Sequence, residues 1–171
     1  MIITTTQEAR HTIAVLVDNE AGVLARVIGL FSGRGYNIES LTVAEVNPRN
    51  RLSRITIVTI GTPMIIEQIK AQLRRLVPVR KVSDLTAEGP DVERELALVK
   101  LKGTGEARRE ALQIAGIFRA RVVDSTNESF VFEIVGHPGK LDAFINLMRP
   151  IGLIDVSRTG VVAIARGSEP L

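Results

Sequence analysis

Hydrophobic positions in the first half of the chain follow two different spacings. Runs rich in β-branched residues predict strands at 12–17, 36–46, 51–60 and 78–85. Between these runs, apolar side chains recur at helical spacing, which indicates helices with one buried face. These helices are predicted at 21–32, with Leu24, Val27, Ile28 and Phe31 inward, and from Pro63 onward, with Ile66, Ile69, Leu73 and Leu76 inward. The predicted order of elements is βαββαβ.

The second half of the chain repeats this order. Strands are predicted at 95–101, 118–124, 129–135 and, broken near Gly160, at 151–157 and 161–165, and helices at 105–115 and 139–148. The clearest echo is Ile60-Gly61-Thr62-Pro63 against Val135-Gly136-His137-Pro138, because each ends a strand and places a proline at the start of a helix. We therefore predict an α+β fold made of two tandem ferredoxin-like βαββαβ domains.

A short polar segment, Thr86 to Asp91, separates the two repeats. Its Gly89-Pro90 pair is typical of a linker. The predicted domains are residues 1–86 and 94–171, joined by a linker at 87–93. Each domain carries its own apolar stripes and is expected to form a separate core.

Composition narrows the possible classes of function. Of the 171 residues, 45% are hydrophobic and 24% charged, and none is cysteine. The balance is that of a globular protein, and the missing cysteine excludes disulfides, thiolate metal sites and a cysteine nucleophile. The N-terminus, Met1 to Gln7, resembles neither a secretion signal nor a transit peptide, and no apolar run approaches the ~18 residues of a membrane span. We expect a cytoplasmic protein with no membrane partner.

The sequence contains no recognisable catalytic motif. The two histidines, His11 and His137, lie at the start of a predicted strand and in a turn. No nucleophile elbow, zinc-protease motif or phosphate-binding loop is present. The net charge is +3 and the basic residues are scattered, which favours a solvated surface over a nucleic-acid interface. We predict a chain with no catalytic residues and no cofactor or metal of its own.

One segment has the chemistry of a ligand site. Asp18 to Leu24 joins the first strand to the first helix, which Asn19 or Glu20 can cap. Free backbone N–H groups at a helix start attract anions such as an amino-acid carboxylate, and Gly22 would allow a close approach. An ordinary capped loop is the competing interpretation. The amide of Asn37, after the predicted helix, could pair with a ligand or only satisfy a strand end.

The run from Asn19 to Val43 closely resembles the signature of the small, regulatory subunit of acetohydroxyacid synthase (acetolactate synthase), whose N-terminal half is an ACT domain. The likeness continues through Leu52–Arg54, Val92–Leu96, Gly139–Phe144 and Ser157–Val162, and so covers nearly the whole chain.

The resemblance implies a non-catalytic partner of a large subunit, which holds thiamine diphosphate, Mg²⁺ and FAD and condenses pyruvate with a second 2-keto acid. It implies that the small subunit activates the large one and makes it sensitive to valine, sometimes to leucine or isoleucine. It also implies a homodimer through the ACT domain, with effector at the interface. Matching motifs make the candidate contacts Asn19, Ala21, Gly22, Val23 and Leu24 of one chain, facing Asn37 and Ile38 of the other. Ala21 and Ala25 stand where the family often has serine.

Two other classes stay open. One is a free-standing ACT-domain sensor that regulates a different enzyme or a transcription system. The other is an RNA-binding module on a ferredoxin-like sheet, which would need exposed aromatics for base stacking. Phe31, Phe118 and Phe144 instead occupy apolar helical or strand positions, so we expect no nucleic-acid partner.

Overall fold

The computed structural model describes residues 7–171, which form two compact units. One unit contains residues up to Val92 together with Val161–Leu171, and the other contains Glu93–Gly160. The prediction about a leader segment rests mainly on residues 1–6, which lie outside the described residues. Each unit is α+β, as predicted, with helices on an antiparallel sheet.

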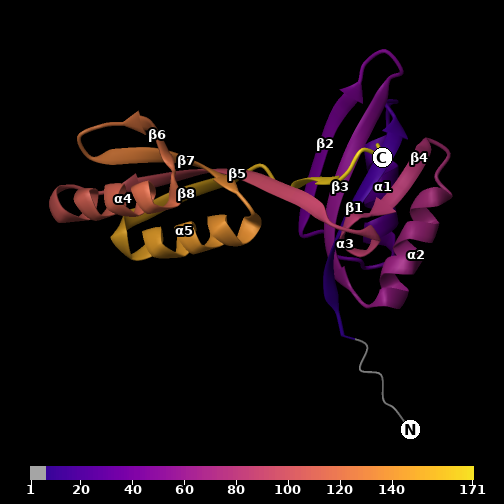
Figure 1. Cartoon of the computed structure of the whole chain (residues 1–171), viewed down its shortest axis with the longest axis horizontal. Helices are drawn as coiled ribbons and strands as arrows, with labels where there is room; N and C mark the ends of the chain where they lie inside the picture. The colour runs from indigo at the N-terminus through magenta and orange to yellow at the C-terminus, as the bar shows by residue number, and fades with distance from the viewer. Residues whose placement is uncertain (1–6) are drawn as a thin grey trace, which may run out of the picture. The chain divides into compact units, whose positions relative to one another are not determined.

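The first unit is built on a four-stranded sheet in the order β2-β3-β1-β4. Its elements are β1 (Ala9–Asp18), α1 (Val23–Gly33), β2 (Ser40–Asn47), β3 (Leu52–Gly61), α2 (Pro63–Arg74), β4 (Val79–Asp84) and the short α3 (Leu85–Glu88). Helices α1 and α2 lie on the same face of the sheet (Figure 1). Their inward stripes include Val27, Phe31, Ile66 and Leu73, as the helical spacing predicted, and pack on Ile13, Val15, Ile55 and Ile57 of the central strands.

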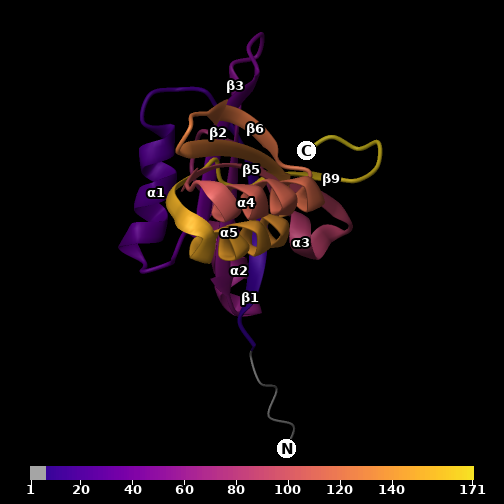
Figure 2. The ribbon, with the colours of Figure 1, turned by 90° about the vertical axis from the view of Figure 1, so that its left-hand side faces the viewer.

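The second unit repeats this arrangement with the strand order β6-β7-β5-β8. Its elements are β5 (Asp91–Lys102), α4 (Gly105–Phe118), β6 (Arg121–Ser125), β7 (Ser129–Gly136), α5 (Pro138–Gly152) and β8 (Leu153–Arg158). Helices α4 and α5 lie side by side (Figure 2). Phe132, Phe144 and Met148 are fully buried between this pair and the sheet. Phe118 ends α4 rather than opening a strand, because the helix runs three residues further than predicted.

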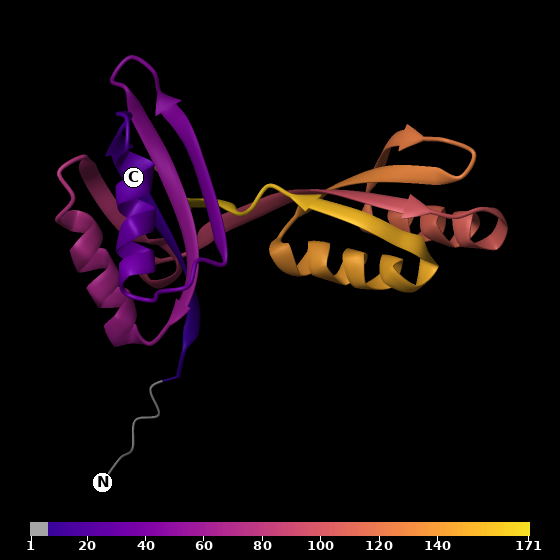
Figure 3. The same cartoon turned by 180° about the vertical axis from the view of Figure 1, so that it is seen from behind.

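The C-terminal segment differs from the prediction. Residues 161–165 were assigned to the closing strand of the second domain; β9 (Val162–Ala165) does pair with β5, as that prediction requires, but it and the residues after it cluster with the first unit. They lie on the face of the first sheet opposite α1 and α2 (Figure 3). Val161 and Ala163 are 3% and 7% exposed and pack against Ala14 and Val58. The first unit therefore contains both terminal parts of the chain.

The predicted linker is largely ordered secondary structure. Its first residues form α3, which Asp84 caps by accepting hydrogen bonds from the N–H groups of Thr86 and Ala87, at 3.2 and 3.3 Å. Leu85, at the start of α3, is buried with Val161. Only Gly89 and Pro90 lie between α3 and β5, and β9 pairs with β5. The Gly-Pro pair is the short connection between α3 and β5.

Candidate functional site

The loop between β1 and α1 is held by backbone hydrogen bonds at its base. The Asp18 N–H donates to the Pro78 carbonyl oxygen at 2.8 Å, and the Asn19 N–H donates to that of Arg51 at 2.7 Å. Gly22 occupies the N-cap position with φ of +84°, a left-handed conformation that favours glycine. A Cβ there would meet no atom within 4 Å, so the space in front of the glycine is open.

The predicted capping of α1 by Asn19 or Glu20 is wrong. No side chain caps this helix. The Asn19 amide instead donates to Glu45 Oε1 at 3.0 Å, and the Glu20 carboxylate accepts from Arg26 at 3.2 Å. The local sequence pattern does not reveal the contact between Asn19 and Glu45, because Glu45 lies on β2, 26 residues further along the chain.

The absence of a cap leaves backbone donors at the start of α1. The Val23 N–H makes only a long contact of 3.4 Å to the Glu20 carbonyl oxygen. For the N–H groups of Leu24 and Ala25, the part of the chain from residue 7 onward supplies no acceptor. These donors carry the partial positive charge of a helix N-terminus, and Ala25 is exposed. The arrangement can accept a carboxylate through main-chain groups alone.

The side chains of the loop divide between core and surface. Val23 is 7% exposed and belongs to the core under the sheet, and half-buried Leu24 packs against that core. Ala21 and Ala25 are exposed and carry no hydroxyl. Val23 therefore offers a ligand no more than its backbone.

The second predicted group lies beyond the other end of α1. Asn37 and Ile38 precede β2, which begins at Ser40 rather than at residue 36 as predicted. The Asn37 carbonyl oxygen accepts from Thr59 Oγ1 at 2.6 Å, and its side-chain amide donates to the Glu39 carboxylate. Ile38 packs partly on the core. The amide of Asn37 is exposed but already has one partner.

The structure does not bring the two groups together within one chain. Helix α1 has 11 residues and separates them by about 16 Å along its axis. Asn19, Ala21, Gly22, Val23 and Leu24 form one continuous loop, whereas Asn37 and Ile38 lie at the opposite end. A ligand the size of an amino acid can contact both groups only if a second copy supplies one of them.

Two neighbours of the loop were missed by sequence reasoning. Arg51 and Asn50, from the turn between β2 and β3, line a small cavity of about 240 Å³ with Asp18, Asn19 and Glu20. Arg51 has φ of +50° and donates from its guanidinium to the Asn19 carbonyl oxygen at 3.4 Å. Only the pairing of β1 with β3 places this turn beside the loop, and no local spacing predicts it.

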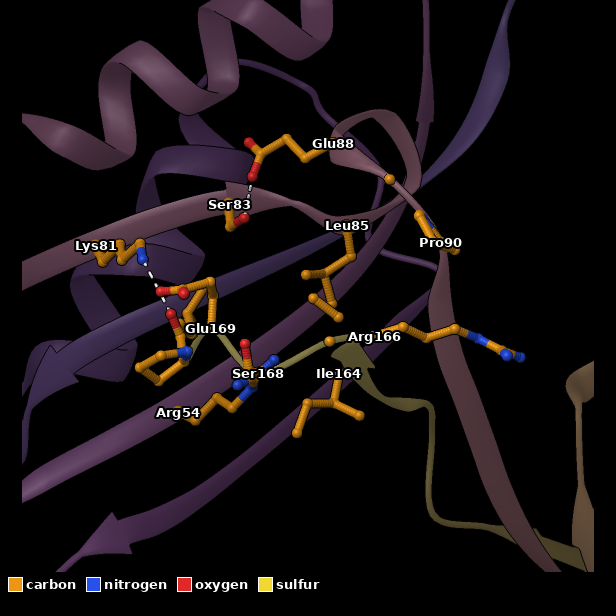
Figure 4. Close-up of a pocket in the computed structure, with 15 residues that line it drawn as sticks. Arg54, Lys81, Ser83, Leu85, Glu88, Pro90, Ile164, Arg166, Ser168 and Glu169 are labelled. Atoms are coloured by element: carbon orange, nitrogen blue, oxygen red, sulfur yellow. Dashed lines mark hydrogen bonds between the residues drawn. The ribbon is translucent and has the colours of Figure 1, made fainter.

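A larger cavity of about 590 Å³ lies between the sheet of the first unit and the C-terminal segment (Figure 4). Its lining carries charges of both signs, among them Arg54, Lys81, Glu88 and Glu169. Lys81 Nζ donates to the Pro170 carbonyl oxygen at 3.3 Å, and Ser83 donates to the Glu88 carboxylate. None of the predicted site residues lines this cavity.

The two histidines serve the fold. His11 Nδ1 is 2.8 Å from Asp84 Oδ2, and His137 caps α5 by accepting from the Gly139 N–H at 3.3 Å. Residues 7–171 contain no group of three or more His, Asp and Glu that could hold a metal ion. Among the helices of the same range, none combines the length and hydrophobicity needed to cross a bilayer.

The fold and the uncapped loop define the first unit as an ACT domain. Residues 13–81 match a family model described as the AHAS small subunit-like ACT domain, AHAS being acetohydroxyacid synthase. Residues 94–167 match a second model, described as the small subunit of acetolactate synthase. The chain belongs to the acetolactate synthase small-subunit family.

Individual relatives agree with this assignment over nearly their whole length. The chain is 49% identical to a probable acetolactate synthase small subunit of Archaeoglobus fulgidus over 94% of this chain and 99% of that protein. It is 46% identical to the acetolactate synthase isozyme 3 small subunit of Escherichia coli, over 94% and 98%. The crystal structure of the Thermotoga maritima small subunit superposes with a TM-score of 0.83 at 40% identity, covering 94% of this chain and 99% of that one.

Proposed function

We propose that this chain binds a large catalytic subunit of acetolactate synthase, activates it and makes it sensitive to feedback inhibition by valine. The carboxylate of the amino acid is held by the main chain at the start of α1. The observation that carries this proposal is the pair of N–H groups of Leu24 and Ala25, which lack acceptors in the described structure at an exposed helix N-terminus. Thiamine diphosphate, Mg²⁺ and FAD would all lie on the large subunit.

A homodimer through the ACT domain completes the proposed site. Strand β2 is at the edge of the first sheet, and its outer side has no partner strand among residues 7–171. Val43 and Val46 on this strand are 43% and 52% exposed. An unpaired edge with apolar side chains is suited to pairing with a second copy. Such pairing would present Asn37 and Ile38 of one chain to the loop of the other, which the length of α1 forbids within a single chain.

The proposed site does not by itself identify which branched-chain amino acid is preferred. Valine, leucine and isoleucine share the carboxylate and ammonium groups, and a pocket separates one methylene by only about 1–3 kcal/mol. Leucine and isoleucine are therefore alternative effectors of the same site.

The proposal is tested in two measurements. Calorimetric titration of the purified chain with each of the three amino acids should give saturable binding of at least one of them, and shows which is preferred. Adding the chain to a large subunit should raise acetolactate formation, and valine should lower it again. Binding of valine without any complex with a large subunit would favour a free-standing ACT-domain sensor.

A further inference from the structure

The first residue of the C-terminal segment is held by two hydroxyl groups of β2. Ser40 Oγ accepts from the Val161 N–H at 2.8 Å, and Thr42 Oγ1 donates to the Val161 carbonyl oxygen at 3.0 Å. Both polar groups of one peptide residue are thus bound by the same strand. We call Ser40, Thr42 and Val161 the clasp.

The surroundings of the clasp make it a firm attachment. Val161 is 3% exposed and packs in a small core with Val58 and Leu85. Next to it, the Arg54 guanidinium donates to the Ala163 carbonyl oxygen at 2.8 Å. Burial lowers the pKa of Arg54, so this cation is partly withdrawn from water and directed at the same segment. The hydrogen bonds of Val161 and Ala163 described above are all partly buried, and partly buried hydrogen bonds are harder to exchange for water.

On its other side, the clasp is one residue away from an anchor in the second unit. Thr159 binds Leu96 of β5 through three hydrogen bonds of 3.0 to 3.3 Å, two involving its side chain. Only Gly160 separates this anchor from Val161. Val161 is therefore connected to a residue bound to β5 through a single intervening residue.

The clasp is also close to the proposed effector site. Asn37 and Ile38 immediately precede β2, and the Glu39 N–H donates to the Val58 carbonyl oxygen at 2.8 Å. Ser40 is the next residue and the first of β2. A ligand that fixes Asn37 and Ile38 acts directly on the start of the strand that holds Val161.

We propose that the clasp transmits effector binding from the ACT domain to the second unit, an inference that rests on the proposed function. Two states differ in whether Val161 is held by β2. The isolated chain binds effector in either state, and only the held state couples the bound effector to the second unit in the holoenzyme, so inhibition requires the clasp. Without the two hydroxyls, effector still binds, but the second unit no longer responds.

The experiment uses the holoenzyme reconstituted with Ser40→Ala/Thr42→Val, which removes both hydroxyls and keeps side-chain size. Activation of the large subunit should stay within about threefold of wild type. The valine Kd, measured by calorimetry on the purified small subunit, should also stay within about threefold. Inhibition at saturating valine should be largely lost, because the coupling between the effector site and the large subunit, typically about five- to 150-fold, then has no link through Val161. Thr42→Ser keeps a hydroxyl and should behave like wild type.

A matched control tests the other end of the segment. Lys81→Met removes the hydrogen bond to Pro170 without touching the clasp, and valine inhibition should be unchanged. Unchanged inhibition in the double variant, or a parallel loss of binding and inhibition, would overturn the inference. If the double variant does not fold, the single variants Ser40→Ala and Thr42→Val are each tested in the same way, and the same outcomes support or overturn the inference. If wild type binds none of the three amino acids, the proposed function fails instead.

Discussion

Arg158 and Glu95 form a two-pronged ion pair within the second unit. Arg158 Nε lies 2.9 Å from Glu95 Oε1, and one terminal nitrogen lies 2.6 Å from Oε2. The Glu95 side chain is 5% exposed, and the other terminal nitrogen binds Asp142 at 2.6 Å. Hydrogen bonding to Glu95 is the main reason that the pKa of Arg158 is raised. This pair joins β5 to β8 just before the chain returns to the first unit.

Removing one member of this pair should destabilise the second unit. Arg158→Leu leaves Glu95 buried without its main partner, which costs about 3–5 kcal/mol for a fully buried pair. Because the guanidinium is 33% exposed, we expect the lower end of this range. Chemical denaturation measures the loss. Arg158→Leu/Glu95→Leu should recover much of it, and a double variant no more stable than the single one would contradict this account.

Gly22→Asp should abolish valine inhibition and leave activation of the large subunit largely intact. The new carboxylate would repel the effector carboxylate at the same N–H groups. A side chain at φ of +84° also costs about 1 kcal/mol. Valine affinity should fall at least tenfold, or about 1.4 kcal/mol, by calorimetry.

Gly22→Ala is the matched control, because it carries the same backbone strain without the charge. It should bind valine more tightly than Gly22→Asp and have similar stability. Normal valine binding by Gly22→Asp would show that the site lies elsewhere. Unfolding of both variants would show that the glycine has only a structural role.

Asn37→Ala should weaken valine binding from the opposite side of the dimer interface. In a mixed dimer of one Gly22→Asp chain and one Asn37→Ala chain, both changes fall in one site and the other site is intact. Calorimetry should then give about half the wild-type stoichiometry at wild-type affinity. Two weakened sites would instead mean that each site is built from a single chain.

The C-terminal segment should contribute to the stability of the first unit. A fragment of residues 1–92 lacks Val161–Leu171 and exposes the apolar patch around Ala14 and Val58. Burying Val161 alone is worth about 1.5–3 kcal/mol. The same fragment fused through a short linker to residues 161–171 should be more stable by at least that amount in a urea titration. Equal midpoints would show that the segment is dispensable for folding.

The purified chain should form no acetolactate from pyruvate with thiamine diphosphate, Mg²⁺ and FAD. The reason is that the sequence carries no catalytic motif and the described residues carry no metal-binding cluster. A colorimetric acetolactate assay on chain free of large subunit checks this. Turnover that persists through further purification would refute it.

The elements of both units were predictable because each repeats a local pattern. The stripe through Val27 and Phe31 lies inward as its spacing required, and so does the stripe through Leu141 and Phe144. The core that residues 161–165 join was not predictable. Alternation of apolar residues predicts a strand, and this strand pairs with β5, but the pattern does not say which core its side chains enter. That depends on a face of Ala14 and Val58 formed far away in the sequence.

The position of the loop between β1 and α1 was predicted correctly, and its hydrogen bonds were not; that the loop binds an effector stays a prediction. The first N–H groups of any helix lack acceptors within the helix, so a predicted helix start after Gly22 already implies free backbone donors. The side-chain cap is absent because Gly22 occupies the N-cap position, three residues after Asn19, whose amide donates to Glu45 of β2. Whether Asn37 and Ile38 face this loop in a dimer stays a prediction.

The division of the first unit between the two ends of the chain affects the order in which the protein can be completed during synthesis. Residues 93–160 are contiguous and can close their core as soon as β8 has been made. The first unit has its strands and helices early but must wait for Val161 and Ala163 before the second face of its sheet is covered. The main core of the first unit contains no residue of the C-terminal segment and can close early, so only the opposite face of its sheet stays uncovered until residues 161–171 have been made.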